Sequence, residues 1–172
     1  MANTYTLISS YTATGSVASI DFTSIPGTYT DLLVRCSVRV ERTVANTPLW
    51  MRVNGDTSSN YSMKLLYGDG SAANTLSYTL GYLITGYVNA NSSTSLTYTN
   101  MDIYIPNYAG STQKSISVDS GEEDNATGAV DGMTAGLWTG TSAITSLTFL
   151  EGNGPSNIRQ YSNFYLYGIK NS

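Results

Sequence analysis

Apolar and polar side chains alternate with a period of two along much of this chain, most clearly over residues 31–42, D-L-L-V-R-C-S-V-R-V-E-R. One side of an extended backbone here carries only apolar side chains: Leu32, Val34, Cys36, Val38 and Val40. The other side carries Leu33 and then polar or charged residues: Arg35, Ser37, Arg39 and Glu41. Because successive side chains of a strand point to opposite faces, this stretch is predicted to be a half-buried β-strand.

Extended patterns recur along the chain, and helical periodicity appears nowhere over a useful length. Strands are predicted at 5–9, 16–22, 31–42, 49–53, 61–67, 76–88 (one strand or two), 95–105, 114–119, 133–138, 144–150 and 161–169. About eight to ten strands without a helix indicate an all-β, antiparallel two-sheet β-sandwich, and a jelly roll fits this length. No linker or internal repeat divides the chain, so 1–172 is expected to form a single β-sandwich domain.

Charge narrows the range of partners. Only 12% of the residues are charged and the net charge is −4, which argues against nucleic acid binding through a broad basic surface. The chain has no apolar run of about 18 residues, so no membrane-spanning helix is expected. The N-terminus lacks the features of a secretion signal, so synthesis in the cytoplasm is expected.

Catalytic chemistry has little support in the residue types. The chain has no histidine, which removes the Ser-His-Asp triad and histidine metal sites, and its single cysteine falls on an apolar strand face. No phosphate-binding or dinucleotide-binding glycine motif is present. Most carboxylates lie in turns beside glycine, where Asp caps the backbone, and no spacing pairs two of them as in a glycosidase. The protein is therefore expected not to be an enzyme and to need no cofactor.

Two charged segments are candidates for protein contact. Three of the eight basic residues, Arg35, Arg39 and Arg42, lie on or just beyond the strand at 31–42. Five of the twelve acidic residues lie within 119–131: Asp119, Glu122, Glu123, Asp124 and Asp131. The acidic segment has three interpretations: a solvated loop, a calcium site whose spacing departs from an EF-hand, or a partner for the arginines of a neighbouring copy.

Aromatic residues are abundant, with fourteen tyrosines and two tryptophans. Aromatic side chains pair well across strands, so sheet packing is one interpretation. An oligomer interface or a sugar-stacking surface is the other, because tyrosine combines an apolar ring with a polar tip. The candidates for stacking on sugar rings are Trp50, Tyr61, Tyr67 and Trp138.

Six motifs in order span nearly the whole chain: IPGTYTDLLV at 25–34, VNGDTSSNYS at 53–62, MDIYIPNY at 101–108, GLW at 136–138, SAITSL at 142–147 and YLYGIK at 165–170. In these motifs the chain resembles small all-β structural proteins of tailed bacteriophages. The resemblance implies a virion component with a jelly-roll-like sandwich, of the decoration, head-fibre or tail-fibre type. It supplies no catalytic residues.

These observations together predict a capsid cement or decoration protein that stabilises the capsid lattice. It is expected to act as a homo-oligomer, with a trimer as the first expectation, and to bind the major capsid protein or another virion protein. A subunit that binds only the assembled lattice stabilises that lattice by mass action. The alternative is a receptor- or glycan-binding module of a tail or head fibre.

Overall fold

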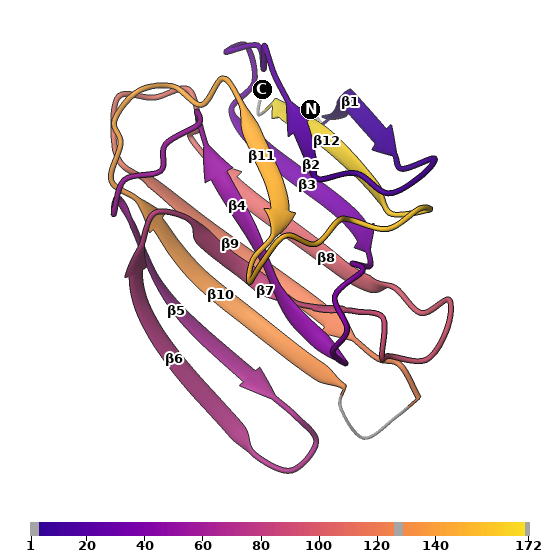
Figure 1. The fold of residues 1–172 in the computed structure, drawn as a ribbon. Coiled ribbons are helices and arrows are strands. Elements are labelled where there is room, and N and C mark those ends of the chain that lie inside the picture. Colours follow the sequence, from indigo (N-terminus) through magenta and orange to yellow (C-terminus); the bar gives the residue numbers. More distant parts are fainter. Residues whose placement is uncertain (1–3, 126–128, 171–172) are drawn as a thin grey trace.

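The computed structural model describes residues 4–125 and 129–170, and all regular elements in those residues are β-strands (Figure 1). The twelve strands found there are β1 Thr4–Thr12, β2 Ser19–Phe22, β3 Asp31–Val38, β4 Asn46–Val53, β5 Tyr61–Gly68, β6 Ala73–Leu80, β7 Leu83–Asn89, β8 Thr99–Pro106, β9 Lys114–Glu122, β10 Val130–Trp138, β11 Leu147–Glu151 and β12 Asn163–Lys170. They pair antiparallel in two sheets, which confirms the predicted all-β sandwich. The described residues form no helix that is long and apolar enough to cross a membrane.

Eight of the strands have the connectivity of a jelly roll. In chain order these are β1, β2, β3, β4, β7, β8, β11 and β12. The first pairs with the last (β1 with β12), the second with the seventh (β2 with β11), the third with the sixth (β3 with β8) and the fourth with the fifth (β4 with β7). This nested pairing produces the orders β1-β12-β3-β8 and β2-β11-β4-β7, one in each sheet.

Two hairpins are inserted into this jelly roll and widen one of its sheets. The β9–β10 hairpin follows β8, and the β5–β6 hairpin follows β4; both join the same edge, giving the eight-stranded order β1-β12-β3-β8-β9-β10-β5-β6. Strand β7 of the four-stranded sheet lies across β8, β9, β10 and β5 (Figure 1). Gly136 of β10 allows this approach, because a Cβ there would lie 2.4 Å from Leu83 of β7.

The core lies between the sheets and is built from the predicted alternation. Leu32, Val34, Cys36 and Val38 of β3 are all buried, as the pattern at 31–42 requires. Phe149 of β11 is fully buried between the two sheets. Its ring lies 6.4 Å from the ring of Phe22 on β2 and 5.1 Å from that of Phe164 on β12, measured between centroids. Aromatic rings from both sheets therefore meet in one cluster.

The Asn-Gly turn after β4 anchors one end of the sandwich. Asn54 and Gly55 both have positive φ, 52° and 68°, and the N–H of Asp56 donates to the carbonyl of Val53, which is a type I′ turn. The Asn54 side-chain oxygen accepts bonds from the N–H groups of Thr145 and Ser146, just before β11. These hydrogen bonds connect the turn to a segment 91 residues further along the chain.

Three details differ from the predictions. The described residues hold twelve strands, more than the expected eight to ten. The segment 76–88 forms two of them, β6 and β7, and the strand predicted at 95–105 begins only at Thr99. Strand β3 ends at Val38, so Arg39 and Arg42 lie beyond it. Leu33, on the predicted polar side, is buried because Tyr167 and Tyr104 flank it across the outer face.

Phe149→Ala removes the ring that joins the two sheets. We expect the free energy of unfolding to fall by about 3–5 kcal/mol, the usual cost of a large core cavity. Urea denaturation followed by fluorescence measures the change. Thr75→Ala, at an exposed position of β6, is the control and should change stability by less than about 0.5 kcal/mol. A small effect at both positions would contradict the central placement of Phe149.

Candidate functional site

A straight row of side chains crosses the outer face of the large sheet, and we call it the central row. Cross-strand partners define it, since directly opposed residues of an antiparallel sheet share a face. In strand order from β1 to β6 its members are Ser10, Tyr165, Arg35, Asp102, Asp119, Met133, Leu66 and Thr75. The six central members come from six different strands, half of them in the jelly roll and half in the inserted hairpins.

Arg35 forms an ion pair at the middle of this row. Its Nη2 lies 3.1 Å from Oδ2 of Asp102, and its Nε donates to the same oxygen at 3.2 Å. The two side chains are 61% and 45% exposed. An exposed pair of this kind adds little to stability, because water and salt screen it. Arg35 is the most exposed of the three predicted contact arginines.

An acidic hollow lies beside the ion pair. Asp102 faces Asp119 directly across the strands, and Asp131 reaches the same hollow of about 340 Å³. Like charges placed directly opposite each other destabilise a sheet. Arg35 neutralises one of the three carboxylates, so the hollow carries a local negative charge that a basic group on a partner would offset.

Within the central row, large apolar side chains lie on both sides of the charged residues. Met133 and Leu66 are 56% and 47% exposed on the hairpin side, and Tyr165 is 37% exposed on the β12 side. The outer face of a solvated antiparallel sheet is ordinarily polar. Arginine, methionine and tyrosine are the residue types that protein interfaces favour.

Arg39 is not a contact residue, which corrects the prediction. It is only 2% exposed, because the loop before β8 folds over its guanidinium. Nη1 donates to the carbonyls of Thr94 and Thr97 at 2.8 and 2.9 Å, and Nη2 donates to the carbonyl of Ser93 at 3.0 Å. The side chain thus fastens the 93–97 loop to the end of β3, and it has no face left for a partner.

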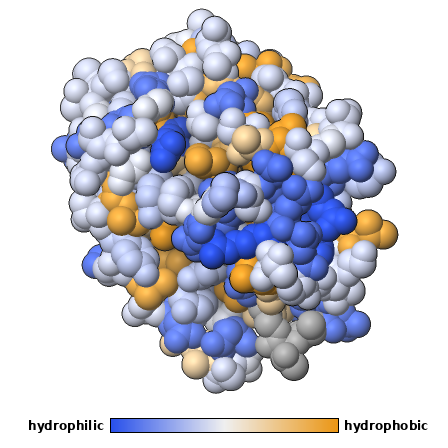
Figure 2. Space-filling model, viewed as in Figure 1, coloured by the Kyte–Doolittle hydropathy of each residue, from blue (hydrophilic) through white to orange (hydrophobic). Residues whose placement is uncertain are grey.

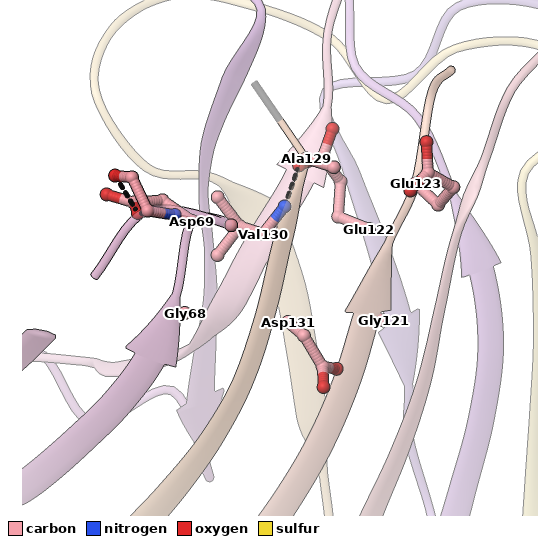
Figure 3. A pocket seen from close by; sticks show the side chains of 10 residues that line it. Gly68, Asp69, Gly121, Glu122, Glu123, Ala129, Val130 and Asp131 are labelled. Carbon is pink, nitrogen blue, oxygen red and sulfur yellow. Dashed lines mark hydrogen bonds between the residues drawn. The ribbon is translucent and has the colours of Figure 1, made fainter. Parts of the chain in front are cut away.

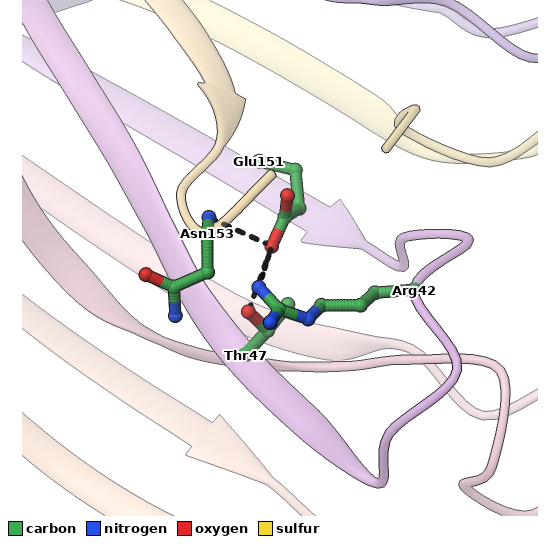
Figure 4. A network of polar contacts seen from close by, with 4 residues as sticks. All are labelled: Arg42, Thr47, Glu151 and Asn153. Atoms are coloured by element: carbon green, nitrogen blue, oxygen red, sulfur yellow. Dashed lines mark hydrogen bonds and ion pairs between the residues drawn. The ribbon is translucent and has the colours of Figure 1, made fainter. Parts of the chain in front are cut away.

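Arg42 lies in a polar network at the same end of the sandwich (Figure 4). Its Nη1 is 3.4 Å from Oε1 of Glu151, whose side chain is fully buried, while the Arg42 side chain is one-third exposed. The same carboxylate oxygen accepts bonds from Thr47 Oγ1 at 2.8 Å and from the N–H of Asn153 at 3.0 Å. Figure 2 shows a hydrophilic area over the loops at this end. Arg42 therefore compensates a buried charge first and is only partly available to a partner.

Three of the five acidic residues of the segment 119–131 lie in strands, and the other two follow β9. Asp119 and Asp131 lie on β9 and β10, on the exposed outer face, and Glu123 is exposed just after β9. Glu122 and Asp124 are instead 3% and 2% exposed, which corrects their prediction as contact residues. The remaining part of the segment, 126–128, lies outside the described residues.

Glu122 is held by hydrogen bonds inside the sandwich. Its two carboxylate oxygens accept bonds from Asn89 Nδ2 at 3.0 Å and from the N–H of Val130 at 2.9 Å (Figure 3). Burial, reinforced by the nearby Asp124 carboxylate, raises the pKa of Glu122 from 4.5 to about 7. This side chain therefore binds a proton near neutral pH while it closes the β9–β10 hairpin.

A pocket of about 710 Å³ lies beside Glu122, between the two inserted hairpins (Figure 3). Asp69 lines it from the β5–β6 turn, but its carboxylate is already committed to that turn. Hydrogen bonds from Ser71, Ala72 and Asn74 hold the pKa of Asp69 at about 2. In the described part of the chain, no group of three or more His, Cys, Asp or Glu side chains is placed to hold a metal ion.

Two of the four sugar-stacking candidates have no exposed ring, which corrects that prediction. Tyr61 is fully buried with its hydroxyl bonded at Val53, and Trp138 is 4% exposed with Nε1 donating to Asp56 at 2.8 Å. Trp50 and Tyr67 are half-buried. The Trp50 ring stacks on Tyr82 with centroids 3.5 Å apart.

The single thiol is not placed for nucleophilic chemistry. Cys36 is buried on the inner face of β3, and burial raises the pKa of its thiol well above the usual value. A thiol becomes a nucleophile only as the thiolate, which this environment disfavours. Cys36 therefore packs as a small apolar residue.

Arg39 and Arg35 form a matched pair for a stability test. Arg39→Met removes the hydrogen bonds to the Ser93, Thr94 and Thr97 carbonyls, of which the bond to Ser93 is buried, and we expect a loss of about 1–3 kcal/mol in the free energy of unfolding. Arg35→Met removes only an exposed ion pair and should cost less than about 1 kcal/mol. Urea titration of both variants measures the difference. Similar small losses would contradict the anchoring role of Arg39.

The raised pKa of Glu122 predicts that the free energy of unfolding depends on pH. The folded protein keeps the Glu122 proton at pH values where the unfolded chain, with a pKa near 4.5, has already lost it. Stability is therefore greater at pH 5 than at pH 8. It declines as the pH rises through about 7, by at most about 3 kcal/mol. Denaturant titrations from pH 5 to 8 should show this slope, and Glu122→Gln should flatten it. The exposed Asp119→Asn is the control, and an equal slope in the wild type and in Glu122→Gln would refute the assignment.

Comparison with known proteins adds no relative. No protein-family model matches the chain, and no curated protein matches it. The central row, the jelly-roll connectivity and the sequence motifs are therefore the features of this chain that bear on its function.

Proposed function

We propose that this protein is a non-enzymatic structural component of a bacteriophage virion, namely a capsid decoration or cement protein. The observation that carries the proposal is the central row, which presents arginine, methionine, leucine and tyrosine on a sheet face that is ordinarily polar. The jelly roll is a fold of viral capsid proteins and also of lectins, so the fold alone supports the proposal only by analogy.

The acidic hollow supports a contact role for the same surface. Asp119 opposes Asp102 at a cost to the sheet, and Arg35 pairs with Asp102, one of the three carboxylates that line the hollow. A basic group on a capsid protein would offset this charge and fix the orientation of the bound subunit. Met133 and Leu66 would then supply the apolar area next to it.

The mechanism is mass action on the assembled lattice. A subunit whose binding site exists only where capsid proteins adjoin stabilises the assembled form over free subunits. The gain grows with the free concentration of the decorating subunit relative to its dissociation constant. Heat or internal pressure would then have to release many such contacts before the lattice opens.

The glycan-binding alternative has less support from the described residues. Only Trp50 and Tyr67 of the four stacking candidates keep partial exposure, and each ring already contacts another: Trp50 contacts Tyr82, and Tyr67 contacts Tyr87. A sugar-binding surface needs an open aromatic face. Binding of the purified protein on a glycan array would favour this alternative over a cement role.

Arg35→Ala tests the proposal. We expect fewer copies bound per capsid and particles that open at a lower temperature, because the variant loses the cation at the middle of the central row. Gel densitometry of purified particles and a thermal release assay measure the two effects. Arg159→Ala, at an exposed arginine outside the central row, is the matched control. Unchanged occupancy and unchanged heat stability in Arg35→Ala would refute the central row as the contact surface.

A further inference from the structure

Strand β1 is an open edge of the large sheet. It pairs with β12 on one side and stands at the end of the strand order, so the described residues supply no strand on its other side. Eight of its nine residues are exposed. A strand of nine residues presents an edge about 30 Å long, with backbone groups available to another strand.

β1 has only one of the devices that protect an edge from pairing, the bulge between Leu7 and Ser9, which follows the stretch that holds Tyr5 and Leu7. Its sequence, TYTLISSYT, holds no charged residue and no proline. Both edge strands of the small sheet are protected from pairing. β2 has only four residues and includes Asp21, and β7 packs across the large sheet. The far edge of the large sheet, β6, is also uncharged, but its outward side chains are small: Ala73, Thr75, Ser77 and Thr79.

The outward side chains of β1 are large and apolar. Tyr5 is 58% exposed and Leu7 is 51% exposed, and both lie on the outer face because they oppose Ile169 and Tyr167 of β12. Tyr5 and Leu7 share this face because they are two residues apart, whereas Ile8 points to the other face and packs against the core. The bulge between Leu7 and Ser9 follows this pair and does not interrupt it. Leu7 also begins an apolar row that continues through Tyr167, Leu33 and Tyr104.

We propose that β1 pairs antiparallel with β1 of a second copy of this chain, about a two-fold axis at Thr6. In this register Tyr5 of each copy faces Leu7 of the other, which joins two apolar side chains twice across the axis. A second copy is the occupant that the chemistry fits, because an identical uncharged strand brings no charge against Tyr5 and Leu7. The two-fold contact is isologous and closes at a dimer, in place of the trimer first expected.

This pairing is independent of the proposed capsid contact. It uses the β1 edge, whereas the central row meets its partner through Arg35 and the hairpin strands. Two-strand pairing with a short apolar row lies at the small end of specific interfaces, so we expect association in the micromolar range. The test therefore uses the purified full chain without particles.

Sedimentation over a concentration series tests the dimer. The wild type should pass from monomer to dimer, and Leu7→Lys should raise the dissociation constant at least tenfold. Met133→Lys changes an equally exposed apolar residue of the same face, five strands away in the sheet order, and should keep the wild-type constant. Thermal melts confirm that the variants fold. A wild type that stays monomeric, a closed trimer, or a Leu7→Lys variant that dimerises normally would overturn the proposal.

A single-cysteine cross-link tests the geometry. Thr6→Cys places two thiols opposite each other across the axis, and mild oxidation should give a covalent dimer. The wild type should give none, because Cys36 is buried. Ser77→Cys, at an exposed position of β6, is the matched control and should not cross-link to itself. Cross-linking through Ser77→Cys and not through Thr6→Cys would assign the contact to the opposite edge and refute the β1 pairing.

Discussion

The shared apolar core between two unequal sheets is the constraint on which the rest of this structure depends. The nested pairing of first strand with last and second with second-to-last brings Phe22, Phe149 and Phe164 together from three distant segments. Burial of these rings is non-directional, but the period of two decides which side chains can reach the core. The same nesting places β1 beside β12 and leaves β1 at the edge.

The inserted hairpins turn a common fold into one with a distinctive surface. Without them the large sheet would end at β8, and Arg35 with Asp102 would lie near its edge. The added strands continue the face with Asp119, Met133 and Leu66, so that one row crosses the whole sheet. Strand β7 packs against β9, β10 and β5 on the inner side, so the outer face of these strands is the side that remains for contact.

Local periodicity predicted the fold class and most strand positions, because each strand reports its own buried face. The buried side of β3 and the alternation in β8 and β9 follow directly from it. Periodicity did not predict which individual charged residues are buried. Arg39 is buried by a loop more than fifty residues away along the chain, and Glu122 is buried through Asn89 of another strand. Such contacts depend on which segments meet, and periodicity contains no signal for that. The central row could not be predicted either, because its members come together only through the order and register of eight strands.

The central row and the β1 edge differ in charge and therefore suit different partners. The central row combines charge with apolar area and suits a different protein of complementary charge. The β1 edge is uncharged and suits an identical strand. The most direct measurement of the proposed decoration role is the number of copies of this protein per particle, counted by quantitative mass spectrometry of purified particles against the major capsid protein. The account predicts hundreds of copies per particle; a handful of copies, or none, would contradict it.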